Sequence, residues 1–216
     1  MKTGLLITAY NRPEYLKQCL ESVSKISYLG ELVILIIDDF SLSKQTIELI
    51  RGFGLKDTEV NKMYLTKNQG IKKSLQIGFN YLFSKNCNLV INLDADAIVK
   101  PQFVDVLIKL KNTYPADIVS GFNTQTIDPK TRQIRHRTLI NFSDHCTKKS
   151  IGGINMVLNK NDYLKKILPA LKKFGHWDWN VCALVNKFIV STPSVVQHIG
   201  IDKGSNMNNP DIAFDF

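Results

Sequence analysis

Residues 89–96 read Leu-Val-Ile-Asn-Leu-Asp-Ala-Asp, an apolar run that ends in two acids separated by one residue. Such a run, bounded by polar residues, predicts a strand buried at the centre of a parallel sheet. Because side chains alternate along an extended chain, Asp94 and Asp96 are expected to project the same way. Two like charges there repel and lose hydration unless a cation neutralises them, and hard divalent cations often share coordination with substrate phosphates. The run therefore predicts a metal site for a diphosphate ligand.

Strands and helices alternate around this run. Predicted strands lie at 4–9, 32–37 and 62–66, and predicted helices at 13–24, 43–53, 71–84 and 101–112. This alternation predicts an α/β protein whose central sheet is mostly parallel and flanked by helices on both faces. Polar clusters follow the strands at their carboxyl ends, where open α/β sheets bind ligands.

The second half of the chain is less regular. We predict a strand at 117–121, an apolar run at 154–158, helices at 161–172 and 179–187, and a strand at 188–191. A basic stretch at 124–150 contains Lys130, Arg132, Arg135 and Arg137; it either holds an anionic acceptor, touches a membrane surface or is a solvated loop. No repeat or Pro/Gly-rich linker divides the sequence. We predict one domain over 1–216, with a nucleotide-binding half at about 1–100 and an acceptor and catalytic half at about 101–216.

Composition is that of an ordinary globular protein and limits the partners. Of 216 residues, 44% are hydrophobic and 22% charged, which are usual values. The longest clean apolar stretch, 32–37, has six residues, against the roughly 20 of a membrane span. Without a signal-peptide pattern, and with four scattered cysteines, the chain is expected to be cytoplasmic, with peripheral membrane contact as an option. The net charge of +9 favours anionic partners, but the dispersed basic residues argue against nucleic acid.

Seven short motifs follow one another along the chain. They are Thr8-Ala9-Tyr10-Asn11-Arg12-Pro13, Ile36-Ile37-Asp38-Asp39-Phe40-Ser41, Asn68-Gln69-Gly70, Asp94-Ala95-Asp96, Gly152-Gly153, Trp177-Asp178-Trp179 and Gln197-His198-Ile199-Gly200. Together they resemble the GT-A-fold glycosyltransferases, most closely family 2, over about residues 3–204. The resemblance implies transfer of a sugar from a nucleotide diphosphate, with UDP-sugar the expected donor, to an acceptor hydroxyl. It leaves the acceptor open among a glycan, a lipid-linked sugar and a protein.

The resemblance also implies which residues hold the donor. Thr8 and Tyr10 match positions that line the base and sugar. Asp38 matches the acid that accepts a hydrogen bond from uracil N3, with Asp39 in a supporting part. The family segment that begins at Asn68 continues to an arginine that is absent here, so Lys72 or Lys73 is expected to supply its charge. The full predicted donor-binding set is Thr8, Ala9, Tyr10, Arg12, Asp38, Asp39, Asn68, Gly70, Lys72, Asp94, Ala95, Asp96, Gly153 and Trp177.

The metal site and the catalytic base are implied in the same way. Asp94 and Asp96 match the DXD motif, in which the second acid binds the metal, and His198 matches the histidine that completes the site. This ligand set suits Mn²⁺ or Mg²⁺, with Mn²⁺ favoured by the imidazole. Asp178 matches the base that deprotonates the acceptor, which gives inversion, although Trp177 replaces the glutamate before it. The indoles of Trp177 and Trp179 are expected to pack against sugar rings.

Three other functions compete with sugar transfer. A dinucleotide-dependent dehydrogenase needs GxGxxG after the first strand, and residues 8–13 do not provide it. A sugar nucleotidylyltransferase needs a glycine-rich loop with a basic residue at the same place, which is also missing. The latter and a catalytically silent nucleotide-sugar-binding module are retained as alternatives, although the presence of Asp178 and His198 favours an enzyme.

Overall fold

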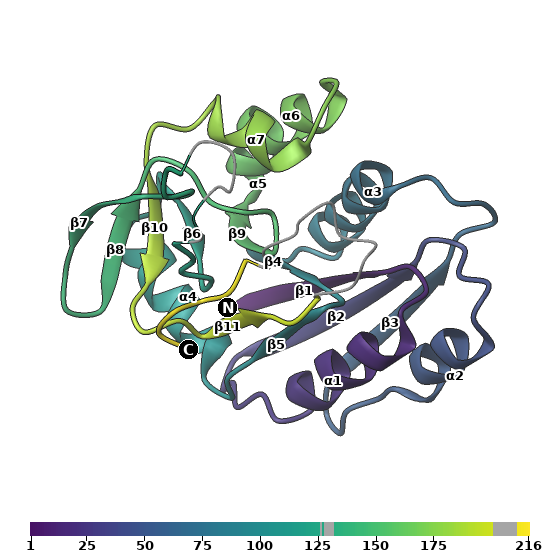
Figure 1. The fold of residues 1–216 in the computed structure, drawn as a ribbon. Helices are drawn as coiled ribbons and strands as arrows, with labels where there is room; N and C mark the ends of the chain where they lie inside the picture. The colour runs from purple at the N-terminus through teal and green to yellow at the C-terminus, as the bar shows by residue number, and fades with distance from the viewer. Residues whose placement is uncertain (126, 128–131, 201–210) are drawn as a thin grey trace.

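The computed structural model describes residues 1–125, 127, 132–200 and 211–216. Among these residues, a nine-stranded sheet in the order β3-β2-β1-β4-β9-β6-β10-β8-β7 forms the centre of the molecule (Figure 1). Its strands are β1 (Lys2–Ala9), β2 (Glu31–Asp38), β3 (Glu59–Tyr64), β4 (Leu89–Asp94), β6 (Ile118–Ser120), β7 (Thr138–Asn141), β8 (His145–Lys148), β9 (Asn155–Asn159) and β10 (Phe188–Ser191). The first four are parallel, as predicted, whereas β9 runs antiparallel to both β4 and β6.

Helices cover both faces of the sheet (Figure 1). They are α1 (Pro13–Val23), α2 (Lys44–Gly52), α3 (Ile71–Ser84), α4 (Phe103–Thr113), α5 (Lys160–Asp162), the π-helical turn η1 (Tyr163–Ile167), α6 (Leu168–Lys172) and α7 (Trp177–Cys182). Alternation along β1 divides the core into two layers: Leu5 and Ile7 pack with α1 and α4, and Leu6 packs with α3, α6 and α7. The fold class predicted from the strand–helix alternation is therefore confirmed.

Local chemistry sets where several helices begin. Pro13 occupies the first turn of α1, where a missing N–H has no cost. The hydroxyl of Ser43 caps α2 by accepting a hydrogen bond from the Thr46 N–H at 3.3 Å. Asn159 and Asp162 form a reciprocal capping box at the start of α5. These caps hold the loops that follow the strands.

Two helices differ from their predicted bounds. The helix expected at 161–172 runs continuously through α5, η1 and α6, with a π turn just before Pro169. Proline cannot donate the i→i−4 hydrogen bond, and a π turn absorbs that defect. The helix expected at 179–187 is α7, which begins at Trp177 and ends at Cys182. No helix within the described ranges is long and apolar enough to cross a membrane.

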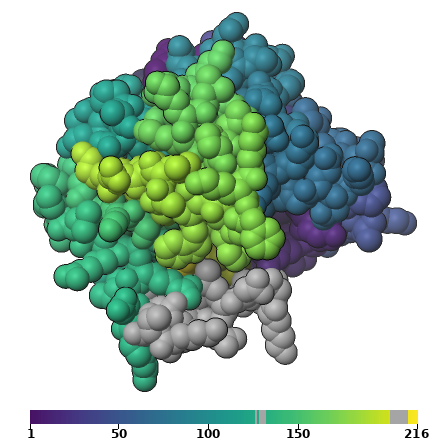
Figure 2. Space-filling model, turned by 90° about the horizontal axis from the view of Figure 1, so that it is seen from above, coloured from purple at the N-terminus to yellow at the C-terminus, as the bar shows by residue number. Residues whose placement is uncertain are grey.

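A second, two-stranded sheet lies against the carboxyl end of β4. It pairs β5 (Ala97–Val99) with β11 (Val196–His198) in antiparallel register, so that His198 lies opposite Ala97. Neither three-residue strand has a pattern long enough to be predicted. Seen from above, the second half of the chain, in green, lies beside the first half, in purple to blue, and the two meet along one boundary (Figure 2).

Candidate functional site

The two acids of the DXD motif lie where β4 ends and β5 begins. Asp94 is the last residue of β4, and Asp96 directly precedes β5. Because β11 pairs with β5, His198 comes next to Asp96, with Nε2 3.4 Å from Oδ2. The short second sheet thus brings together two predicted metal ligands that lie about a hundred residues apart in sequence.

Arg12 closes the other side of Asp96. Its Nη1 lies 2.6 Å from Asp96 Oδ2 in a partly buried ion pair. The chain turns sharply before it, since Asn11 and Arg12 both adopt the left-handed conformation, with φ of 52° and 56°. The Asn11 side chain holds this turn by accepting hydrogen bonds from the Leu42 and Ser43 N–H groups at 3.0 and 3.2 Å. The ion pair between Arg12 and Asp96 therefore links the loop after β1 to the DXD loop.

The pKa values of the two carboxyl groups are shifted in opposite directions. Burial and then the neighbouring charges of Asp96 and Asp178 raise the pKa of Asp94 well above its usual value. Burial would also raise the pKa of Asp96, but its hydrogen bond to His198 and the charges of His198 and Arg12 lower it. Burial tends to lower the pKa of His198, and its interactions with Asp96 outweigh burial and raise it. Asp96 is thus held as the anion.

The imidazole of His198 is oriented from behind. Its Nδ1 lies 3.2 Å from the carbonyl oxygen of Asp211, so the ring nitrogen that faces Asp96 is Nε2. Gly200 completes the corner: a Cβ there would overlap Asp96 Oδ2 and lie 2.9 Å from His198 Nε2. Neither Gly200 nor Asp211 was in the predicted site, although Gly200 belongs to the Gln197–Gly200 motif that carried the histidine.

These residues fit a divalent cation in part. Asp94 Oδ1 is buried and has no hydrogen-bond partner among the described residues, so this oxygen is available to coordinate a cation. Asp96 and His198 offer the carboxylate and imidazole that suit Mn²⁺. However, no three His, Cys, Asp or Glu side chains in the described ranges lie together as a complete metal cage. A cation here would need further ligands, and diphosphate oxygens are the ligands that such sites commonly share.

Two adjoining cavities follow the carboxyl ends of β1, β2 and β4. The first, about 210 Å³, is lined by Thr8, Ala9, Tyr10, Asp39, Asn68, Gly70, Ile71 and Ser74. The second, about 130 Å³, is lined by Thr8, Tyr10, Asn11, Arg12, Ile71, Asp94, Ala95 and Asp96. Three shared residues make them one groove from Asp39 to Asp96. The hydroxyls of Thr8 and Ser74 in it are buried with no hydrogen-bond partner among the described residues.

The two acids after β2 have different surroundings. Asp39 lines the first cavity, and its carboxylate accepts hydrogen bonds from the Gln69 and Gly70 N–H groups at 2.8 and 2.7 Å. Asp38 lines neither cavity, and accepts from the Ser41 N–H at 3.1 Å. Asp38 ends β2, and alternation sends the next side chain the other way. The structure thus gives Asp39 the cavity position that we expected Asp38 to hold.

Three other predicted donor residues lie elsewhere. The ammonium of Lys72 donates to the Lys173 carbonyl at 2.7 Å and lines neither cavity, contrary to its expected role in place of the missing arginine. Trp177 is 7% exposed and packs in the core. Gly153 has to be a glycine because a Cβ there would lie 2.7 Å from the Trp177 ring. Gly153 thus accommodates an indole, and Trp177 is not free to stack on a sugar.

Asp178 lies in the first turn of α7, where its Oδ1 accepts a hydrogen bond from the Trp179 N–H at 2.9 Å. Its charge helps to raise the pKa of Asp94, and it also acts on the imidazole of His136. Burial nevertheless lowers the pKa of His136 below its usual value. Asp178 is therefore within electrostatic reach both of the DXD loop and of the second half of the chain.

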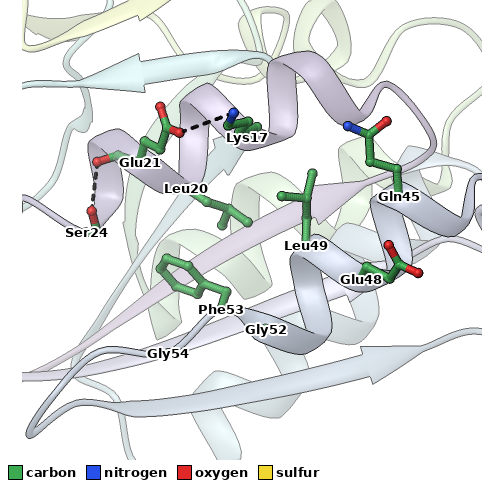
Figure 3. Close-up of a pocket in the computed structure, with 10 residues that line it drawn as sticks. All are labelled: Lys17, Leu20, Glu21, Ser24, Gln45, Glu48, Leu49, Gly52, Phe53 and Gly54. Atoms are coloured by element: carbon green, nitrogen blue, oxygen red, sulfur yellow. Dashed lines mark hydrogen bonds and ion pairs between the residues drawn. The ribbon is translucent and has the colours of Figure 1, made fainter.

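A larger cavity, about 490 Å³, lies between α1 and α2, and its residues are unrelated to this groove. Figure 3 shows Leu20, Leu49 and Phe53 turned toward one another at its floor, with Glu21 and Glu48 at its edges. It extends along α2, from Gln45 in the first turn of that helix to Gly54 just after its end.

Comparison with known proteins shows the family of this chain. The sequence matches the family described as "Glycosyl transferase family 2" over residues 5–190. An N-acetylglucosaminyltransferase of Mesorhizobium japonicum is 32% identical over 108 residues, which are 49% of this chain and 24% of that protein. One from Bradyrhizobium elkanii is 29% identical over 107 residues, 49% of this chain and 56% of that protein. The matched segment thus spans from about a quarter to about half of these relatives.

Solved structures share the fold. GalNAc-T7 with UDP, GalNAc and Mn²⁺ superposes with a TM-score of 0.70 at 16% identity, covering 92% of this chain and 44% of that one. S. aureus TarS 1–349 in complex with UDP-GlcNAc superposes with a TM-score of 0.61 at 15% identity, covering 91% of this chain and 58% of that one. With the family match over residues 5–190, the chain belongs to glycosyltransferase family 2 and has the GT-A fold.

Proposed function

We propose that this chain transfers a sugar from a UDP-sugar to an acceptor hydroxyl, with UDP-GlcNAc the first donor to test. The observation that carries the proposal is the groove that runs from Asp39, past Thr8 and Tyr10, to Asp96 beside His198. A nucleoside diphosphate would place its base in the cavity at the Asp39 end and its diphosphate in the cavity at the Asp96 end. The curated relatives named as N-acetylglucosaminyltransferases support the choice of sugar.

At the base end, the donor would be recognised by buried polar groups. Uracil N3–H is a donor, and a carboxylate is a strong fixed acceptor for it. We assign this contact to Asp39, which lines the cavity and whose two backbone hydrogen bonds hold its carboxylate still. The unpartnered hydroxyls of Thr8 and Ser74 lie in the same cavity and are available to the nucleotide.

At the diphosphate end, Asp96 and His198 would hold Mn²⁺ or Mg²⁺, with Asp94 beside them. Such an ion, when bound, supplies positive charge to the oxygens of the leaving diphosphate. Arg12 contributes from the chain itself: its guanidinium keeps Asp96 ionised and places a fixed positive charge at the same end of the groove.

At the acceptor side, Asp178 would act as general base. The acceptor hydroxyl gives its proton to the Asp178 carboxylate while its oxygen bonds to the anomeric carbon from the face opposite the diphosphate. The bond between that carbon and the diphosphate oxygen breaks, and UDP leaves with the electron pair. The single displacement inverts the anomeric centre. The electrostatic reach of Asp178 to Asp94 supports this placement.

Calorimetry of the whole chain with UDP, UDP-GlcNAc, UDP-galactose and GDP, each with and without Mn²⁺, tests the donor assignment. We expect uracil nucleotides to bind at least tenfold more tightly than GDP, and only with the metal. Equal affinity for GDP would refute the assignment. Release of UDP from UDP-GlcNAc in the presence of Mn²⁺ would separate an enzyme from a silent binding module on the same fold.

A further inference from the structure

Another cavity opens in the other half of the molecule, next to the helix that carries Asp178. It has a volume of about 590 Å³. It is lined by residues from 133–139, by Lys149 and Ser150 just after β8, and by residues of α7 and the turn after it. The side chains that matter here are Arg135, His136, Arg137, Lys149, Ser150 and Trp179. We call it the basic cavity. Neither the donor groove nor the proposed mechanism has used these residues.

The Lys, Arg, Asp and Glu side chains that line the basic cavity, among the described residues, are all basic. Arg135, Arg137 and Lys149 line it, and no Asp or Glu is among the described residues that do so. Arg137 and Lys149 are exposed and form no ion pair within the described part of the chain. Cations gathered in a concave site focus a positive potential and attract an anion. Lys130, predicted to belong to the same basic stretch, lies outside the described residues.

An aromatic ring faces the same cavity. Trp179 stacks on His136, with ring centroids 5.4 Å apart and planes at 26°, and remains 50% exposed. His136 is buried and held by a 3.0 Å contact between its Nδ1 and the Ser150 hydroxyl. The indole is thus fixed from one side, and its exposed surface is large, rigid and amphipathic, the kind of surface that packs against the apolar face of a sugar ring.

The position of the basic cavity relative to the reaction follows from α7. Asp178 and Trp179 are consecutive residues in the first turn of α7, and Trp179 lines the basic cavity. A molecule seated on Trp179 would therefore lie next to the proposed base. An acceptor hydroxyl has to be there, between the base and the anomeric carbon, so that the base can take its proton while its oxygen attacks.

We propose that the basic cavity binds the acceptor, and that the acceptor is a saccharide carrying a phosphate group. The sugar would pack on Trp179, and the phosphate would pair with Arg137 and Lys149. The two exposed cations match a phosphate monoester better than a singly charged carboxylate, because the monoester carries up to two charges and three acceptor oxygens, which a guanidinium binds in a forked geometry. The inference rests on the proposed function, because it assigns the acceptor of the same reaction.

The test is a titration of the whole chain, saturated with UDP and Mn²⁺ so that the donor groove is filled, and followed by ligand-detected NMR. The probes are glucose 6-phosphate, glucuronic acid and glucose. We expect glucose 6-phosphate to bind at least tenfold more tightly than glucose, with glucuronic acid between them. Equal affinities, or no binding of any probe, would overturn the inference.

Variants locate the binding. Arg137→Gln with Lys149→Gln should weaken glucose 6-phosphate at least tenfold and leave glucose unchanged, whereas Trp179→Ala should weaken both. Lys25→Gln changes an exposed lysine that lines neither the donor groove nor the basic cavity, so it is the control and should change nothing. Unchanged affinity in the double variant would contradict the assignment. UDP affinity, measured on each variant, reports folding.

Two outcomes separate the competing explanations. If UDP does not bind, the proposed function fails, whatever the sugar phosphates do. The second outcome is that UDP binds, glucose 6-phosphate does not, and the parent chain binds phosphatidylcholine vesicles containing phosphatidylglycerol whereas the double variant does not. The basic cavity is then a membrane contact, and the inference is overturned.

Discussion

At the scale of single residues, the groove depends on a few side chains that make different contacts and are therefore expected to have different roles. Asp96 is gripped from both sides by Arg12 and His198, while Asp94 is buried with an oxygen that has no partner among the described residues. Asp178 stands apart, in the first turn of α7. Substitutions at these positions should therefore separate donor binding from the chemical step.

Replacing Asp178 by asparagine should remove the proposed base and keep the shape and the Trp179 N–H contact. We expect the rate of transfer to fall by about 10²–10⁴, the usual contribution of general-base catalysis. The dissociation constant of UDP with Mn²⁺ should stay the same. Steady-state kinetics and calorimetry measure the two quantities, and a near wild-type kcat would show that Asp178 is not the base.

Gly200→Ala tests the corner between Asp96 and His198. The added Cβ would overlap Asp96 Oδ2, so the carboxylate and the imidazole have to move apart. We expect Mn²⁺-dependent UDP affinity to fall at least tenfold. Gly54→Ala is the matched control, because a Cβ there meets nothing within 4 Å. If both variants bind UDP as the parent does, Gly200 is not part of the site.

At the scale of elements, β8 carries a buried cation that the site does not explain. The side chain of Lys148 is fully buried and donates to the Thr124 carbonyl at 2.5 Å. Burial lowers its pKa from 10.5 to about 8, although Cys146, Asp215 and Asp211 oppose the shift. The strand itself is paired with β10 on one side and with β7 on the other.

This lysine predicts how stability depends on pH. Between about pH 8 and 10.5 the unfolded chain keeps the proton that the folded chain has lost, so the free energy of unfolding should rise with pH in that window. The full effect is roughly 3 kcal/mol, because one unit of pKa is worth about 1.4 kcal/mol. Urea unfolding at pH 7.5 and 10 measures it. Lys148→Met should lack this rise; equal slopes in the two proteins would contradict the buried-lysine argument.

At the scale of the whole molecule, the donor groove joins segments from both ends of the chain. Residues 8–12 and 94–96 come from the parallel half, and His198 is oriented by the carbonyl of Asp211. Further contacts anchor the same C-terminal segment, from the Asp215 carboxylate to Ser194 and from Ala213 to Gln197. A ligand that fills the groove should therefore stabilise the molecule as a unit.

Scanning calorimetry measures this effect. With UDP and Mn²⁺ at 100 times the dissociation constant, binding contributes about 2.7 kcal/mol, and the melting temperature should rise by roughly 5–10 °C. UDP alone, or Mn²⁺ alone, should give little. Asp96→Ala should abolish the joint effect while keeping a single unfolding transition. A similar rise with UDP in the absence of metal would show that the cation is not needed.

Much of this arrangement could be predicted from local sequence, because it depends on short-range patterns. The apolar runs that end in Asp38 and Asp94 predict parallel strands, and the carboxyl ends of such strands meet at one edge. What could not be predicted depends on helix phase and strand alternation. Trp177 and Trp179 are the same type of residue, but side chains two positions apart on a helix point to nearly opposite sides. Trp177 is therefore buried and Trp179 is exposed. Asp38, the last residue of β2, and Asp39, which follows it, differ because side chains alternate along an extended chain.

Periodicity and turn chemistry are local, so the residues alone predicted the α/β class, the alternation of strands and helices in the first half and the two DXD acids. Three-dimensional packing was needed to show that Gly200 and the Asp211 carbonyl complete the histidine corner, that Lys72 lies outside the groove, and that three cations and an indole share one cavity beside Asp178. These are contacts between segments far apart in the chain. They depend on the pairing of β5 with β11 and on the packing of α7, and no short window of sequence encodes either.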